Sequence, residues 1–260
     1  MKYLCGTILA NQQVSKRYWR IATEVSGLDE PVRPGQFFHV RCSDNLKNML
    51  RRPFSIYKWN PYNRIIEFLY LVKGEGTAAL TEKRPGQLLD MIGPLGHGFS
   101  LPPNQAPILL AARGVGVATL NALAQKALVE KHNVFVLISA RTRADLLAAS
   151  DLERAGATVL NVTDEEGTSS VPRVARLAQD LITEQSISAA YTCGSKRLAR
   201  LIRELAAQSG INAEIAIEAH MACGMGDCYA CAGRLRDGDQ IRTVRVCSEG
   251  PVFPIRKVVL

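Results

Sequence analysis

The chain has 260 residues, 47% of them hydrophobic and 22% charged, which is the composition of a globular protein with two or three domains. No apolar run approaches the roughly 20 residues that span a bilayer, and the N-terminal residues lack the layout of a signal peptide, so no membrane association is expected. The net charge of +8 could attract phosphate-bearing cofactors or an acidic partner. Because no aromatic–basic motif accompanies that charge, nucleic-acid binding is not expected.

Residues 2–101 alternate short strand-like runs with turns. The clearest runs are residues 18–22, 36–40 and 65–72, and Pro-Gly pairs between such runs mark turns. A single short helix is expected at residues 77–83. Many short strands with one helix predict a small antiparallel β-barrel.

Three polar features of this region could carry function. His39 lies in a strand without a partner motif, and is expected to be a satisfied strand residue rather than a ligand. Arg52 stands three residues before Ser55 on an extended strand, so the backbone between them can meet a flat heterocycle. An edge strand with surface arginines explains this pattern equally well. Residues 74–77 precede the helix and form either an anion site or an ordinary helix start with Thr77 as N-cap.

A Pro-rich segment at residues 101–107 marks a domain boundary, after which the pattern changes. Buried strands then alternate with helices, and this alternation predicts a parallel sheet covered by helices on both faces. The strands are expected at residues 108–112, 134–138, 158–161 and 189–192, and the helices up to residue 131, over 143–155, over 171–183 and up to 208.

Two turns at the carboxyl edge of this sheet are candidate ligand sites. Gly114 and Gly116 occupy the first strand-to-helix turn, where pyrophosphates commonly bind, although they form only part of a G-x-G-x-x-G pattern. Cys193 and Gly194 end a later strand at the same edge. Cys193 there either contacts a nicotinamide or is a small buried residue.

Four of the seven cysteines form the pattern C-x4-C-x2-C-x15-C, namely Cys223, Cys228, Cys231 and Cys247. An odd total with this clustering opposes a disulfide scaffold and indicates a cysteine-ligated centre in a reducing compartment, which we take to be the cytoplasm. Three ligands in one loop suit a [2Fe–2S] cluster better than a structural zinc ion, which prefers paired knuckles. Cys5 and Cys42 are expected to be small buried residues.

The motifs follow one another along essentially the whole chain: Arg52-Pro53-Phe54-Ser55, residues 74–77, residues 93–96, the glycine turn, Cys193-Gly194, the four cysteines and residues 246–253. In this order they resemble the electron-transfer subunit of the two-component, NAD-dependent dihydroorotate dehydrogenase, a ferredoxin-reductase-like flavoprotein. The resemblance implies a multidomain β and α/β fold. It has an antiparallel FAD-binding β-barrel at residues 1–101, an NAD-binding-like parallel-sheet domain at 102–212 and a small [2Fe–2S] module at 213–260, whose metal centre is expected to supply much of its fold.

The resemblance also implies roles for individual residues and a partner. FAD would be held by Arg52, Pro53, Phe54, Ser55, Leu69, Tyr70, Leu71, Gly76 and Thr77. NAD(H) would bind near Gly114, Gly116, Cys193 and Gly194. The implied partner is an FMN-containing catalytic subunit, in a heterotetramer. Electrons would pass from its substrate to FMN, through the cluster to FAD, and on to NAD.

The chain departs from the family pattern at several positions. Leu71 stands where relatives usually have Arg, and Lys73 could compensate for that missing cation. Arg113 replaces a glycine of the nucleotide turn, so it either obstructs the dinucleotide or neutralises a phosphate. The acidic loop is altered at residues 164–168, and Ser195 replaces a proline. Two alternatives to a dihydroorotate dehydrogenase subunit are therefore kept. The first is a relay with weakened NAD binding that serves a different flavin dehydrogenase or a protein acceptor. The second is a zinc-stabilised, non-enzymatic binding module.

Overall fold

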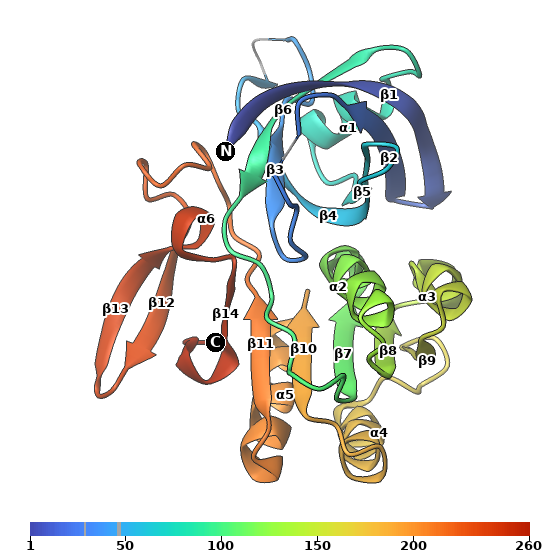
Figure 1. Ribbon diagram of the computed structural model, residues 1–260, viewed down its shortest axis with the longest axis vertical. Coiled ribbons are helices and arrows are strands. Elements are labelled where there is room, and N and C mark those ends of the chain that lie inside the picture. The colour runs from blue at the N-terminus through green and yellow to red at the C-terminus, as the bar shows by residue number, and fades with distance from the viewer. Residues whose placement is uncertain (29, 46–47) are drawn as a thin grey trace.

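The computed structural model describes residues 1–28, 30–45 and 48–260. An N-terminal barrel lies beside a parallel sheet with its helices, and a C-terminal hairpin flanks that sheet (Figure 1). The expected combination of antiparallel barrel, parallel-sheet domain and small C-terminal module is therefore confirmed. In the described part of the chain, no helix is both long enough and apolar enough to cross a membrane.

The barrel is closed by antiparallel strands in the order β1-β2-β5-β4-β3-β6. Its elements are β1 (Lys2–Ser15), β2 (Tyr18–Val25), β3 (Phe37–Val40), β4 (Arg52–Asn60), β5 (Ile65–Leu71), α1 (Glu75–Thr81) and β6 (Leu88–Leu95). Burial alternates along the first half of β1, so that Leu4 and Ile8 are buried whereas Cys5 points outward. Cys42 is buried as expected, but the expectation that Cys5 is buried is wrong.

Aromatic rings fill the centre of the barrel. Phe38 and Phe68 meet edge to face with their centroids 5.8 Å apart, and Phe54 packs against both Phe68 and Tyr70. Burying one such ring stabilises the fold by about 1.5–3 kcal/mol. The strands that carry the expected flavin residues are therefore held on a rigid core.

The second sheet has the order β14-β11-β10-β7-β8-β9. Its strands are β7 (Ile108–Arg113), β8 (Val134–Ala140), β9 (Thr158–Thr163), β10 (Ala189–Cys193), β11 (Asn212–Ala216) and β14 (Val252–Pro254), with β14 alone antiparallel among these six. The helices are α2 (Val117–Val129), α3 (Ala149–Ala155), α4 (Val171–Glu184) and α5 (Lys196–Ser209). Buried residues of α2 and α3 join one core and those of α4 and α5 another, so helices cover both faces as predicted.

Two helix starts differ from the sequence prediction. Helix α1 begins at Glu75 with Gly74 as N-cap, so Thr77 lies inside the first turn and is not the N-cap. The helix expected at 143–155 is a short 3-10 turn at Arg143–Asp145 followed by α3. Ala148 separates them with φ of 64°, a left-handed conformation that a continuous helix cannot contain.

The C-terminal segment forms the hairpin of β12 (Ala232–Asp237) and β13 (Gln240–Arg245), then α6 (Val246–Glu249) and β14. Because β14 pairs with β11, this segment also completes the parallel-sheet domain, and the boundary expected at residue 213 falls within β11. The His97 N–H donates to the Gly250 carbonyl oxygen at 2.6 Å. This bond joins the barrel's exit turn to the end of α6.

Candidate functional site

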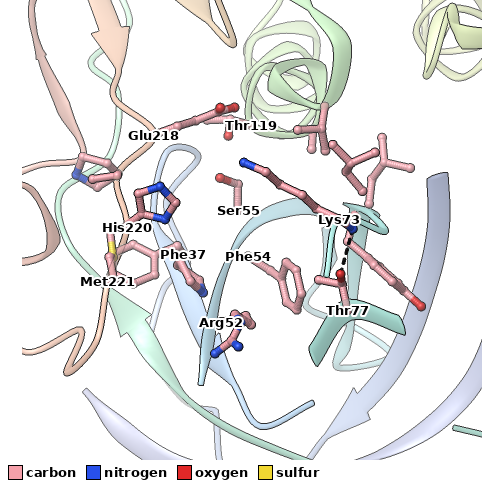
Figure 2. Close-up of a pocket in the computed structure, with 18 of the residues that line it drawn as sticks. Phe37, Arg52, Phe54, Ser55, Lys73, Thr77, Thr119, Glu218, His220 and Met221 are labelled. Atoms are coloured by element: carbon pink, nitrogen blue, oxygen red, sulfur yellow. Dashed lines mark hydrogen bonds between the residues drawn. The ribbon is translucent and has the colours of Figure 1, made fainter. Parts of the chain in front are cut away.

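A cavity of about 610 Å³ opens between the barrel, the start of α2 and the segment that follows β11. Figure 2 shows Arg52, Phe54 and Thr77 on its barrel side, with Glu218, His220 and Met221 on the side of that segment. This volume is in the range of cofactor sites. Ten of the residues assigned to FAD or NAD(H) line it: Arg52, Pro53, Phe54, Ser55, Leu69, Tyr70, Leu71, Gly76, Thr77 and Cys193.

The barrel wall of the cavity is built from the start of β4, the end of β5 and the start of α1. The Thr77 hydroxyl oxygen accepts the backbone N–H groups of Lys73 at 2.9 Å and Gly74 at 3.2 Å, which fixes the loop before α1. A Cβ on Gly76 would lie 3.2 Å from the Arg52 guanidinium, a tight contact that glycine avoids. The arrangement offers a cation and backbone donors to a phosphate group.

The opposite wall carries a thiol and a carboxylate. The Cys193 thiol donates to Glu218 at 3.9 Å, a long contact of the kind sulfur makes. Burial raises the pKa of Cys193 well above its ordinary value, and Glu218 raises it further. Burial also raises the pKa of Glu218, although solvent reaches its side chain through the cavity mouth. The positive charge of Lys73, which also lines the cavity, opposes this rise in the pKa of Glu218. Among the described residues, no carboxylate lies within salt-bridge distance of Lys73.

The lining residues that sequence reasoning missed include Phe37, Thr119, Glu218, His220 and Met221. The last three follow β11 at the carboxyl edge of the parallel sheet, where ligands gather, and this placement was the signal that could have found them. Phe37 carries no such signal. It lies in a short strand whose four residues are all buried.

The glycines assigned to NAD(H) lie beside the cavity rather than in its lining. A Cβ on Gly116 would come within 2.5 Å of the Cys193 carbonyl oxygen, and one on Gly194 would collide with the Arg113 carbonyl oxygen. These glycines therefore allow the turn after β7 to pack directly against the turn after β10. Val115, between Gly114 and Gly116, is the residue of that turn that reaches the cavity.

Arg113 does not line the cavity. Its guanidinium donates to the Ser139 hydroxyl at 2.5 Å and pairs with Asp164 at 2.6 Å. Hydrogen bonds from Ser169 and Arg113 lower the pKa of Asp164. The side chain is thus held along the edge of β8 and β9, away from the flavin-sized space.

The four expected metal ligands lie together in two pairs. Cys223 interacts with Cys228, and Cys247 with Cys231, whose sulfur accepts the Cys247 backbone N–H at 3.4 Å. Among the described residues no three metal-ligating side chains already surround one point. A [2Fe–2S] cluster needs two protein ligands on each iron, which is the arrangement that these pairs provide.

The loop around the thiols favours their ionised form at one position. Burial raises the pKa of Cys223, but backbone N–H groups of Cys228 and Met225 outweigh it and lower the pKa to about 6. Burial and the neighbouring Cys231 thiol raise the pKa of Cys247 to about 12. Arg245 clamps the loop, with its guanidinium over the Tyr229 ring and bonded to the Gly226 carbonyl oxygen at 3.1 Å.

Two buried polar groups beside this loop have no partner among the described residues. They are the Ser248 hydroxyl and the His39 imidazole. The prediction that His39 is a satisfied strand residue is therefore wrong: it is 1% exposed, and neither ring nitrogen has a hydrogen-bond partner of normal geometry in the described chain. Unsatisfied buried donors next to four thiols fit a bound group with exposed sulfur atoms.

A flavin-sized cavity between a barrel and a parallel sheet, with paired thiols beside it, defines a ferredoxin-reductase-like electron-transfer protein. Residues 218–259 match the family model described as the iron-sulfur cluster binding domain of dihydroorotate dehydrogenase B. The dihydroorotate dehydrogenase B (NAD(+)) electron transfer subunit of Desulforamulus reducens is 32% identical over 99% of this chain and 98% of its own length. The chain belongs to this family of electron transfer subunits.

Other relatives and solved structures agree with this placement. The corresponding subunit of Geobacillus thermodenitrificans is 31% identical over 98% of this chain and 97% of its own length. The structure of an NADH-dependent reduced ferredoxin-NADP oxidoreductase, described for its insights into flavin-based electron bifurcation, superposes with a TM-score of 0.82 at 25% identity. The match covers 98% of this chain and 89% of its own. Ferredoxin-NADP+ reductase from Plasmodium falciparum shares the fold, with a TM-score of 0.62 at 13% identity over 82% of this chain and 96% of its own.

Proposed function

We propose that this chain relays electrons between an FMN-containing dehydrogenase subunit and NAD, through a [2Fe–2S] cluster and FAD. One observation carries the proposal. Nine residues of the barrel expected to hold FAD surround one cavity, and the far wall of that cavity, residues 217–221, continues directly into the cluster loop at Cys223. Short separations of this kind are what electron transfer between bound centres requires.

The barrel residues would bind and orient FAD. Arg52, held against Gly76 and bonded to the Leu50 carbonyl oxygen at 2.6 Å, would neutralise a phosphate of the cofactor. Thr77 would keep the loop before α1 in the conformation that presents its backbone to that phosphate. Lys73 would supply the second cation that Leu71 does not. When bound, FAD supplies the chemistry that joins two-electron transfer with NAD(H) to one-electron transfer with an iron–sulfur centre.

The wall formed by Thr119, Cys193 and Glu218 would receive the nicotinamide. Cys193 is buried and its high pKa keeps it a neutral thiol, so it would act by shape and not as a nucleophile. Glu218 would border the contact between the two rings and accept the Cys193 thiol hydrogen. Gly114, Gly116 and Gly194 would bring the two turns close enough to form this wall.

The C-terminal module, proposed as residues 213–260 beside domains at 1–101 and 102–212, would carry the cluster on Cys223, Cys228, Cys231 and Cys247. A dihydroorotate-oxidising FMN subunit is the proposed partner, in a heterotetramer, and the reduced thiols fit the proposed cytoplasmic location. The match to an iron–sulfur family model favours a cluster over the zinc-stabilised module.

Anaerobic titration of the purified protein with NADH, followed by visible absorption, tests the relay. We expect flavin and cluster bands that both bleach. Iron and acid-labile sulfide near two atoms of each per chain should accompany them. Zinc without sulfide would contradict the cluster, and a full spectrum that NADH leaves unchanged would contradict the use of NAD(H).

The partner is tested separately. The similarity to a ferredoxin-NADP oxidoreductase over 98% of this chain keeps a different flavin dehydrogenase or protein acceptor as the alternative. Co-expression with the host's dihydroorotate dehydrogenase should yield a complex that reduces NAD when dihydroorotate is added. A relay that bleaches with NADH but forms no such complex would identify the alternative.

A further inference from the structure

The outer face of β3 connects the flavin cavity to the cluster loop. Phe37 lines the cavity, and His39, two residues further along the same face of the strand, meets the loop. Two residues of an extended strand span about 7 Å, so one rigid strand touches both sites. The inner face carries Phe38 and Val40 in the barrel core, which leaves β3 little freedom to move.

His39 contacts the loop at its first glycine. A Cβ on Gly224 would lie 2.6 Å from His39 Nδ1, so the ring rests directly on the backbone between Cys223 and Met225. Gly224 has φ of 72°, a left-handed conformation that turns this part of the loop toward the barrel. The imidazole is therefore part of the wall that surrounds the thiols, although it comes from another domain.

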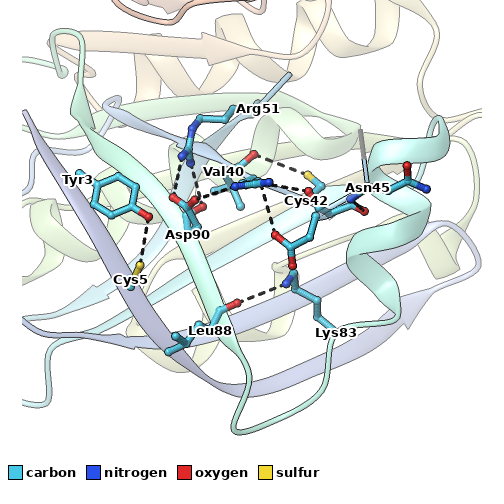
Figure 3. A network of polar contacts seen from close by, with 12 residues as sticks. Tyr3, Cys5, Val40, Cys42, Asn45, Arg51, Lys83, Leu88 and Asp90 are labelled. Atoms are coloured by element: carbon cyan, nitrogen blue, oxygen red, sulfur yellow. Dashed lines mark hydrogen bonds and ion pairs between the residues drawn. The ribbon is translucent and has the colours of Figure 1, made fainter. Parts of the chain in front are cut away.

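Arg51 and Asp90 form a charged pair on the barrel (Figure 3), and Arg51 also holds the backbone of His39. Arg51 donates to the carbonyl oxygens of His39 at 3.3 Å and Asp90 at 3.2 Å, and its guanidinium pairs with the Asp90 carboxylate at 2.8 Å. Both side chains of this ion pair are about one-fifth exposed. Such a pair holds the strand, and hence the ring, in one position.

An imidazole carries at least one N–H in either protonation state, and a buried N–H without a partner carries a free-energy cost. His39 is 1% exposed, and neither nitrogen has a partner of normal hydrogen-bond geometry among the described residues, although the backbone of Cys223 and of Arg51 lies near the ring. The cost is removed if a sulfur atom of the bound cluster, or the Cys223 thiolate that ligates it, accepts that N–H.

We infer that His39 is a positioning residue of the iron–sulfur centre, whose N–H donates to a sulfur of the cluster or of its ligand Cys223. This inference rests on the proposed cluster. It identifies His39 as the residue through which the flavin-binding barrel contacts that cluster. A hydrogen bond to sulfur stabilises the reduced, more negative state and so raises the reduction potential. The barrel thereby tunes the centre that exchanges electrons with its own flavin.

The test uses the full chain with FAD and cluster bound, in wild-type, His39→Leu and His39→Gln forms. The cluster potential is measured by a redox titration monitored by electron paramagnetic resonance. We expect His39→Leu to disfavour cluster reduction about tenfold, a fall of about 59 mV for one electron. His39→Gln, which keeps an N–H donor, should restore most of that shift, whereas the FAD potential should be the same in all three forms.

A second measurement covers the case in which a variant fails to assemble. Pulsed resonance of reduced wild-type protein labelled with ¹⁵N-histidine should show a nitrogen coupled to the cluster. A His220→Leu form, which removes the histidine three residues before Cys223, should keep that coupling. Absence of the coupling, an unchanged potential in His39→Leu, or a shift confined to FAD would each overturn the inference. A wild-type protein without a cluster signal would instead contradict the proposed function.

Discussion

Arg113 at the end of β7 and Asp164 in the loop after β9 form an ion pair of 2.6 Å across the carboxyl edge of the parallel sheet. The intervening strand β8 contributes Ser139, which accepts a second bond from the same guanidinium. An arginine in a nucleotide turn could have blocked the dinucleotide. The Arg113 guanidinium points to Asp164 and does not line the cavity, so Val115 is the residue of this turn that lines it.

Arg113 is therefore expected to assist NADH binding by neutralising Asp164 near the pyrophosphate. Arg113→Ala should raise the KM for NADH about tenfold and leave kcat unchanged, because the freed carboxylate repels phosphate equally in the ground and transition states. Steady-state reduction of a dye by NADH measures both constants. Asp164→Asn removes the same ion pair without leaving a bare anion, so an equal rise in KM in that variant would mean that the pair acts only by holding the fold.

Arg52 is expected to hold a phosphate of FAD. Arg52→Ala should weaken FAD binding about 10- to 100-fold, because a charge-assisted hydrogen bond to phosphate contributes about 1.5–3 kcal/mol. Titration of apoprotein with FAD, followed by quenching of flavin fluorescence, gives the affinity. Arg84→Ala removes an exposed arginine just beyond α1 and should leave the affinity unchanged; equal weakening in both variants would point to net charge rather than to this contact.

Cys228 is the most exposed of the four expected ligands. Cys228→Ser should abolish the cluster, since loss of one thiolate leaves one iron with a single protein ligand, while FAD stays bound in the separate barrel cavity. Iron content and the visible spectrum report the two cofactors independently. Cys5→Ser, at an exposed thiol on the outside of the barrel, should retain both. Loss of FAD from the Cys228 variant would contradict the modular arrangement.

Asp151 of α3 joins the parallel-sheet domain to the barrel. Its carboxylate is 10% exposed and accepts from Lys58 at 2.7 Å and from the Tyr57 hydroxyl at 2.6 Å. Asp151→Asn should destabilise the protein by about 2 kcal/mol, because Lys58 then lacks its buried counter-charge. A fall of about 4–8 °C in Tm is expected. Asp180→Asn, at an exposed position of α4, should leave Tm unchanged. An equal fall in Tm in that variant would show that the loss of stability does not come from the contact between the domains.

The same contact predicts a pH dependence. Burial alone would raise the pKa of Asp151, but hydrogen bonds from Lys58 and Tyr57 outweigh it and lower the pKa below the ordinary value of 3.8. A lowered carboxylate pKa contributes stability above the unfolded pKa and loses it as the pH falls through the folded one. Urea unfolding should therefore separate wild type from Asp151→Asn by a constant amount between pH 7 and 5. The separation should narrow below about pH 4, and a separation that grows with acid would refute the assignment.

Much of the fold followed from patterns along the chain. The short apolar strands β7, β8 and β10 are buried on both faces, and a run of neighbouring apolar residues predicts that burial. The sequence prediction was wrong at two helix starts, because capping depends on backbone angles. Gly74, not Thr77, is the N-cap of α1, and the left-handed backbone of Ala148 divides the second predicted helix. Cys5 was predicted to be buried, but it neighbours the buried Leu4 in β1, and successive side chains of a strand point to opposite faces.

Some features of the candidate site could be predicted from the sequence, whereas others depend on tertiary packing. The thiol spacing was sufficient to expect a cluster, because three of its four ligands lie within one loop. The flavin was expected only from the resemblance that the Arg52–Ser55 run carries together with the other motifs. Glu218 and Phe37 could not be placed in one cavity from sequence, since they belong to different sheets whose packing no local pattern specifies. The direction of Arg113 depended likewise on Ser139 and Asp164, which only the parallel register brings beside it.

By itself the sequence determined the chemistry that this protein can carry: four thiols at a cluster spacing, a flavin-type strand and a dinucleotide-type sheet. The tertiary structure alone decided how those parts meet. It set the His39 ring against Gly224, closed the cavity with the segment after β11, and returned β14 to the parallel sheet. Residue types and spacings are local properties, whereas these contacts join distant segments through strand order and side-chain packing.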